Sequence, residues 1–144
     1  MSSSSTICPD ASIVVRLLLN HEPGADIVTL WKEWRAAGYS FIAPTLLFYE
    51  ISNVMHQYAC QGYLSSEEVK MGFLLAFRLN IKTVEDVFLQ RRAVDIAQQW
   101  QLPATYDAHY LAVAERYNAR FFTTDRQLVS RVQSDLAWVR LWDQ

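Results

Sequence analysis

Short apolar segments alternate with helical patterns along the chain, and this alternation constrains the fold more than any other feature of the sequence. Five segments have the length and composition of strands: residues 7–10, 39–43, 80–84, 119–123 and 137–142. Helical patterns separate them, over residues 13–19, 25–37, 45–61, 65–77, 85–100, 106–117 and 126–132. Strands that alternate with helices form a parallel sheet covered on both faces. The sequence therefore predicts an α/β fold.

Local signals mark the ends of several helices. Ser65 and Glu68 form the S-x-x-E pattern of a capping box, and Gly62 is placed to close the helix before it. Pro44 stands where the helix over residues 45–61 would begin, because proline is favoured in the first turn. The first helix is expected to stop at residues 21–24, which contain a Pro and a Gly.

Length and composition favour one domain. A chain of 144 residues with 51% hydrophobic and 19% charged residues can build one core, which we expect over residues 7–142 after a disordered tail at residues 1–6. Five Trp, seven Tyr and seven Phe are many for this length. We expect some of them to lie in a partner interface, where aromatic residues are favoured.

Charge and cysteine content narrow the function and the compartment. A formal net charge of −2 excludes a broadly basic nucleic-acid binder, so phosphate binding must be local or carried by metal ions. Cys8 and Cys60 have neither zinc-site spacing nor the density of a disulfide scaffold, which favours reduced thiols. Without a signal peptide or a long apolar stretch, we expect a cytoplasmic protein that does not enter membranes.

Three aspartates occupy equivalent places at helix starts. Asp10 and Asp125 each follow a predicted strand and precede a helix, and Asp107 lies at the start of another helix. Taken singly, each suits an N-cap, since Asp is among the preferred capping residues. In parallel α/β folds, however, the carboxyl ends of the strands are also where ligands bind.

Glu50 is different because it lies in the middle of an apolar helix. Helical spacing predicts a row of Leu46, Glu50, Asn53 and Gln57, a polar stripe on a largely buried helix. Burying an ionised Glu costs several kcal/mol without compensation, and a cation compensates several converging carboxylates. A carboxylate cluster without His or Cys suits Mg²⁺ or Mn²⁺ and not zinc.

Four motifs follow one another along the chain: ICPDAS at residues 7–12, Glu50 with Asn53 in the helix that opens at Pro44, YDAHYLA at residues 106–112 and FTTDRQL at residues 122–128. In this order they resemble the PIN domain family, and within it the VapC-type toxins of bacterial toxin–antitoxin pairs. The resemblance covers nearly the whole chain, and the four acids are separated by 40, 57 and 18 residues.

The resemblance implies a three-layer α/β/α sandwich with a central parallel five-stranded sheet, and cleavage of RNA with one or two Mg²⁺ or Mn²⁺ ions. Carried over by position, the catalytic metal ligands are Asp10, Glu50, Asp107 and Asp125. The supporting polar groups are Ser12, Asn53 and Thr123. It also implies a homodimer and a cognate antitoxin that lays a helix in a groove.

Other interpretations stay open or fall away. A haloacid-dehalogenase-like phosphatase would need a second Asp where Ser12 stands, and four scattered Gly exclude a P-loop or a dinucleotide fingerprint. The three histidines are not expected to be ligands, and scattered basic residues such as Arg16, Lys32, Arg35 and Arg126 are either solvated or steer RNA. The remaining alternatives are a PIN-like module that binds RNA or protein without cleavage, and a housekeeping RNA-processing nuclease.

Overall fold

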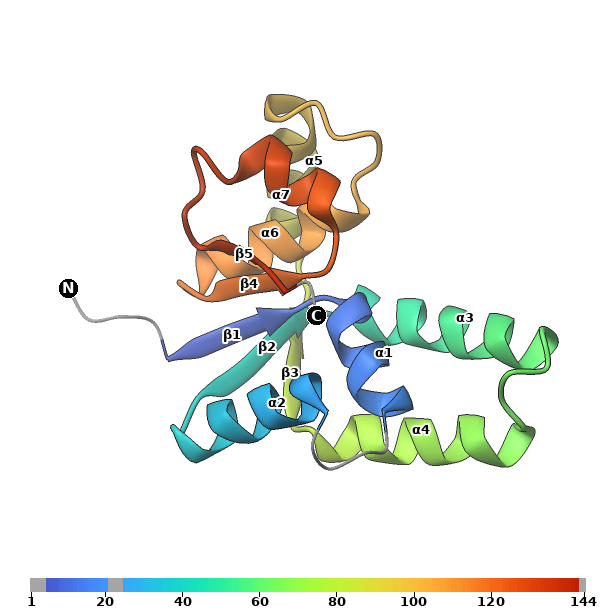
Figure 1. Ribbon diagram of the computed structural model, residues 1–144. Coiled ribbons are helices and arrows are strands. Elements are labelled where there is room, and N and C mark those ends of the chain that lie inside the picture. The colour runs from blue at the N-terminus through green and yellow to red at the C-terminus, as the bar shows by residue number, and fades with distance from the viewer. Residues whose placement is uncertain (1–4, 21–24, 143–144) are drawn as a thin grey trace.

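The computed structural model describes residues 5–20 and 25–142, which form a five-stranded sheet with helices on both faces (Figure 1). The strands are β1 (Thr6–Pro9), β2 (Ser40–Pro44), β3 (Ile81–Val84), β4 (Arg120–Thr123) and β5 (Val139–Leu141). All neighbouring strands are parallel, in the order β3-β2-β1-β4-β5. The predicted α/β/α sandwich with a parallel five-stranded sheet is confirmed.

Seven helices of the described residues cover the sheet. They are α1 (Ala11–Leu19), α2 (Asp26–Ala36), α3 (Leu46–Cys60), α4 (Ser66–Arg78), α5 (Val87–Gln99), α6 (Tyr106–Arg116) and α7 (Arg126–Val132). Helices α1 to α4 lie on one side of the sheet and α5 to α7 on the other (Figure 1). Of the predicted disordered tail at residues 1–6, residues 1–4 lie outside the described residues, whereas Thr6 belongs to β1. The predicted helix stop at residues 21–24 also lies outside the described residues.

The predicted helix-end signals at Ser65 and Gly62 are confirmed, whereas the one at Pro44 is not. The Glu68 amide donates to Ser65 Oγ over 3.1 Å and the Ser65 amide donates to Glu68 Oε1 over 2.9 Å, so the capping box is confirmed. Gly62, just past α3, has φ +82°, a conformation that glycine adopts without steric strain. The placement of Pro44 at a helix start was wrong, because it ends β2 opposite Val84 and α3 begins two residues later.

The tryptophans of α2 belong to the core. Trp31 stacks on Phe41 of β2 with ring centroids 4.3 Å apart, and Trp34 meets Phe122 of β4 at 4.8 Å. Both tryptophan side chains are buried. The expectation that surplus aromatic residues lie in an interface therefore does not apply to them.

The strand order creates a crevice at one edge of the sheet. From β1 the chain moves outward to β2 and β3, and then returns to the other side of β1 to form β4 and β5. Loops leaving the carboxyl ends of β1 and β4 therefore part in opposite directions. Such a topological switch point is where ligands bind in open parallel sheets.

Candidate active site

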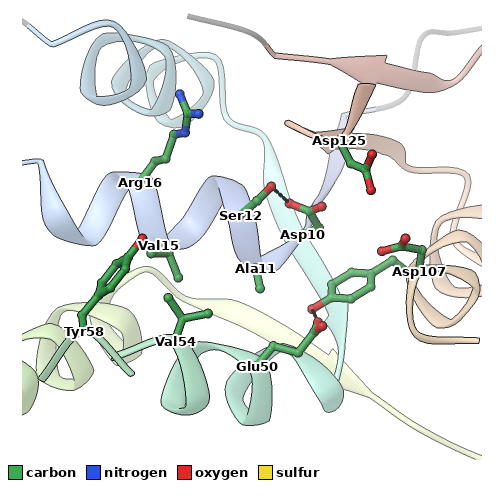
Figure 2. A pocket seen from close by; sticks show the side chains of 11 residues that line it. Asp10, Ala11, Ser12, Val15, Arg16, Glu50, Val54, Tyr58, Asp107 and Asp125 are labelled. Carbon is green, nitrogen blue, oxygen red and sulfur yellow. Dashed lines mark hydrogen bonds between the residues drawn. The ribbon is translucent and has the colours of Figure 1, made fainter. Parts of the chain in front are cut away.

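A cleft of about 420 Å³ lies at this switch point, and all four predicted acids line it (Figure 2). Asp10 follows β1 and Asp125 follows β4, while Glu50 comes from α3 and Asp107 from α6. The four acids reach the cleft from both helical layers and from two strand ends. The structure thus brings together residues that lie up to 115 positions apart in the sequence.

Asp10 lies at the floor of the cleft with only 7% of its surface exposed. Ser12 Oγ donates to Asp10 Oδ1 and Thr123 Oγ1 donates to Asp10 Oδ2, both over 2.5 Å. The Ile13 amide adds a third bond to Oδ1 over 3.2 Å, which makes Asp10 the N-cap of α1 as predicted. These bonds fix both oxygens of the carboxylate in one orientation.

The same network connects Asp10 to the loop that carries Asp125. Thr123 Oγ1, which is fully buried, accepts a bond from the Asp125 amide over 3.1 Å. Ser12 Oγ accepts a bond from the Thr124 amide over 3.2 Å. Ser12 and Thr123 therefore hold the ends of β1 and β4 together.

Burial raises the pKa of Asp10 to about 6. The hydrogen bonds from Ser12, Thr123 and Ile13 oppose this shift, and the charge of Asp107 adds to it. A carboxylate with three donors that still has a raised pKa is short of positive charge. A cation placed beside this carboxylate would stabilise its ionised form.

Asp107 is held in a different way. It lies in the first turn of α6, whose N-cap is Thr105, so the prediction of Asp107 as a helix cap was wrong. Within residues 5–20 and 25–142, no donor forms a hydrogen bond with its carboxylate. Partial burial, and then the charges of Asp125 and Glu50, raise the pKa of Asp107 to about 6. Asp125 is exposed and caps α7 by accepting from the Leu128 amide over 3.1 Å.

Tyr110 is a cleft residue that the sequence interpretation did not assign. Its hydroxyl donates to Glu50 Oε1 over 2.5 Å, and its ring is buried. Burial, and then the neighbouring Glu50 charge, raise the pKa of Tyr110 far above its usual value, so the hydroxyl keeps its proton. Tyr110 lies three residues after Asp107 and hence on the same helix face, a signal that could have found it.

The predicted polar row on α3 was wrong. The side chains that follow Glu50 into the cleft are Val54 and Tyr58, at spacings of four and eight residues. Asn53 and Gln57 are exposed, and Asn53 does not line the cleft. The reason is the helical period, because one face of a helix can continue through i+4 and i+8 as well as through i+3 and i+7. The supporting role of Asn53 stays a prediction.

The cleft has the donor chemistry for a hard divalent cation. Its potential ligands are carboxylate oxygens, which Mg²⁺ and Mn²⁺ prefer. In the part of the chain that the structure describes, no three His, Cys, Asp or Glu side chains lie close enough together to hold a metal ion. The acids therefore share the cleft without meeting at one point, and one or two of them could hold an ion such as Mg²⁺, which keeps several of its waters.

Comparisons with known proteins agree with the fold and the motif order. A family model described as "PIN domain" matches residues 7–133. The chain is also similar to a solved structure described as "Crystal Structure of PAE2754 from Pyrobaculum aerophilum", with 22% identity, a TM-score of 0.60, and coverage of 90% of this chain and 87% of that chain. At this identity the likeness concerns the fold. No curated protein matches the chain.

Proposed function

The chain belongs to the PIN domain family, whose members are generally nucleases, and from this premise we propose that it is a metal-dependent ribonuclease. The catalytic residues in this proposal are Asp10, Glu50, Asp107 and Asp125. One observation supports it above the others. Four carboxylates from four separate elements share one cleft, and two of them have pKa values raised to about 6.

The chain's own groups have distinct tasks in this proposal. Asp10 is the fixed ligand, because Ser12 and Thr123 orient both of its oxygens. Tyr110 orients Glu50 through one hydrogen bond and leaves its second oxygen for a ligand. A bound Mg²⁺ or Mn²⁺ ion would neutralise phosphate oxygens and increase the acidity of a nearby water. Hydrolysis then adds this water across one P–O bond of the RNA.

Cleavage assays test the proposal directly. We expect the purified protein to cut unstructured and structured RNAs with Mn²⁺, and to lose this activity with EDTA or as the Asp10→Asn variant. Asp135→Asn is the matched control, since Asp135 is exposed and does not line the cleft. Equal cleavage by the wild type and Asp10→Asn, or no cleavage with any divalent metal, would contradict the nuclease.

A finer proposal is that the chain is a VapC-type toxin that acts in the cytoplasm, as a homodimer controlled by an antitoxin. The outer face of α4 supports a partner, because it exposes Met71, Leu74 and Phe77, with exposed fractions of 53–68%. No helix among the described residues is long and apolar enough to cross a membrane. Both cysteines, Cys8 and Cys60, are free thiols.

Induced expression separates the toxin from the two alternatives. A toxin should arrest growth, and a small antitoxin reading frame should lie beside its gene. Harmless expression of an active nuclease would favour housekeeping RNA processing. RNA binding without cleavage would favour a binding module. Light scattering of the purified protein tests the homodimer, and a monomeric mass would contradict it.

A further inference from the structure

A second hollow of about 350 Å³ adjoins the carboxylate cleft. The two hollows share the side chains of Val15, Arg16 and Tyr58, and the second one extends to Trp142. Figure 2 shows Arg16 and Tyr58 on the side of the cleft away from Asp107 and Asp125. We call the two hollows together the trough. It leads from the four carboxylates to Trp142.

Arg16 is the single basic side chain that lines the carboxylate cleft in the described part of the chain. It lies one helical turn after Ser12 on α1, and so on the helix face that carries Ser12 to the floor of the cleft. A nucleic-acid strand brings a negative charge with each nucleotide. Four carboxylates in the cleft, and Asp26 in the second hollow, would repel such a strand, and Arg16 is the basic side chain that supplies attraction along both hollows.

Trp142 holds the Arg16 guanidinium in place. The Cζ atom of Arg16 lies 5.3 Å from the centroid of the Trp142 ring, within the range of a cation–π contact. The Trp142 amide donates to the carbonyl oxygen of Thr123 over 2.8 Å. Thr123, at the end of β4, also donates a hydrogen bond to Asp10. The end of β4 therefore positions both the Arg16 guanidinium and the carboxylate at the floor of the cleft.

Tyr58 provides an aromatic surface in the trough. It lies on α3, two turns after Glu50, and is half-buried. Its ring packs edge-on against Tyr63, with centroids 6.1 Å apart, and this contact restricts its orientation. Every nucleobase can stack on such a ring, so a surface of this kind binds single strands with little sequence preference.

We propose that the trough is a subsite for the nucleotide that flanks the cleaved phosphodiester of a single-stranded RNA, with Arg16 binding its phosphate and Tyr58 stacking against its base. Trp142 is the positioning residue for Arg16. This assignment rests on the proposed nuclease function for the identity of the strand. Its contacts with phosphate and base can be tested without cleavage.

Binding of fluorescein-labelled ten-nucleotide oligo(U) and oligo(A), measured by anisotropy in the Asp10→Asn background with Mn²⁺, tests the subsite. We expect Arg16→Gln to weaken binding about tenfold and to reduce the slope of log K against log salt by about 0.7, the value for one phosphate contact with a single strand. Arg16→Lys should restore the slope. Arg91→Gln is the matched control, because Arg91 is exposed on α5 and lines neither hollow.

Cleavage kinetics separate the subsite from the nuclease itself. In a cleaving protein, Arg16→Gln should raise KM about tenfold and change kcat less than threefold. Cleavage with an unchanged KM would overturn the subsite and leave the nuclease intact. A wild type that never cleaves, but binds oligo(U) in an Arg16-dependent way, would overturn the nuclease and support the subsite. Equal Arg16 dependence with oligo(dT) would support contacts with phosphate and base that do not involve the 2′-hydroxyl.

Two aromatic variants test the other parts of the trough. Trp142→Leu should raise KM about threefold, while Trp142→Phe should remain close to wild type because a ring still faces Arg16. Tyr58→Leu should weaken binding of oligo(A) more than of oligo(U), since the larger base stacks more strongly. Binding that is indifferent to Arg16, Tyr58 and Trp142 together would overturn the subsite.

Discussion

Two groups of carboxylates in this protein have opposite surroundings. On the outer surface, Glu115 of α6 accepts two bonds from Arg92 of α5, over 2.7 and 2.9 Å. These bonds hold the pKa of Glu115 below its usual value, and those from Arg116 do the same for Asp86. In the cleft, burial and neighbouring carboxylates raise the pKa values of Asp10 and Asp107 instead.

The difference shows what each group contributes to the protein. A carboxylate with a lowered pKa stabilises the fold when ionised, whereas one with a raised pKa costs stability at neutral pH. The cleft therefore keeps charges that the fold would be more stable without. Groups of perturbed titratable residues in a cleft are typical of functional sites.

Replacing one acid from each group gives the largest expected contrast. Asp107→Asn should lower kcat at least about 100-fold, because loss of an outer-shell partner already costs 10- to 100-fold in metal sites. Asp86→Asn should keep activity within twofold, since Asp86 lies on the outer surface and Asn can also cap α5. Metal-dependent cleavage of one RNA by both variants measures the contrast. Comparable losses in both would show that the two groups do not differ in function.

Replacing Asp10 with Asn should stabilise the fold at neutral pH, whereas the loss of a paired surface carboxylate usually destabilises it. The unfolded Asp10 carboxyl has a pKa near 3.8 and the folded one near 6, so rising pH ionises the unfolded state first and destabilises the fold between about pH 4 and 6. Two units of pKa correspond to about 3 kcal/mol. Without added metal, the variant should exceed the wild type by about this free energy of unfolding at pH 7, and match it near pH 4.

Urea unfolding at several pH values measures this difference. Asp86→Asn should show the opposite sign, because a lowered pKa stabilises the fold above the unfolded pKa and loses this effect as pH falls. If Asp10→Asn were less stable than the wild type at pH 7, the three hydrogen bonds to the Asp10 carboxylate would stabilise the fold by more than the burial of its charge destabilises it. The contrast between the two groups would then fail.

The fold was predictable because its signals are local. Alternating patterns predicted every described strand and helix to within a few residues, and Asp10, Ser65 and Asp125 cap the helices that they precede. The four acids were predictable as a set because motif order, together with the edge of a parallel sheet, places them at one end. Pro44 was misplaced because proline is compatible with both a strand end and a helix start.

Contacts between distant elements were not predictable in this way. Tyr110 and Glu50 lie 60 residues apart, and no local pattern specifies which oxygen the hydroxyl meets. The Arg16 contact with Trp142 joins α1 to the residue after β5. The direction of the cleft-facing row on α3, through Val54 instead of Asn53, depends on how the helix is rotated against α1. Packing determines that rotation.

Removing the Tyr110 hydroxyl tests how much the hydrogen bond that orients Glu50 contributes to activity in the cleft. Tyr110→Phe keeps the buried ring, which packs 6.0 Å from Phe121, but leaves Glu50 without its donor. We expect kcat to fall about tenfold, because Glu50 is no longer oriented, while unfolding changes by only about 1 kcal/mol. Titration with Mn²⁺ should show weaker metal binding. Tyr117→Phe is the control, and unchanged kcat and metal affinity in Tyr110→Phe would remove Tyr110 from the site.

The smallest effect is expected at the surface pair of Arg92 and Glu115. Both side chains are about 40% exposed, so solvent screens their attraction, and such pairs contribute about 0.2–1 kcal/mol. Arg92→Met should lower the free energy of unfolding by no more than this, with less effect in high salt, and should leave cleavage unchanged. Urea unfolding at low and high salt measures it, with Arg91→Met as the neighbouring control. A loss of several kcal/mol would mean that the Arg92–Glu115 pair stabilises the fold by as much as the buried cleft carboxylates destabilise it.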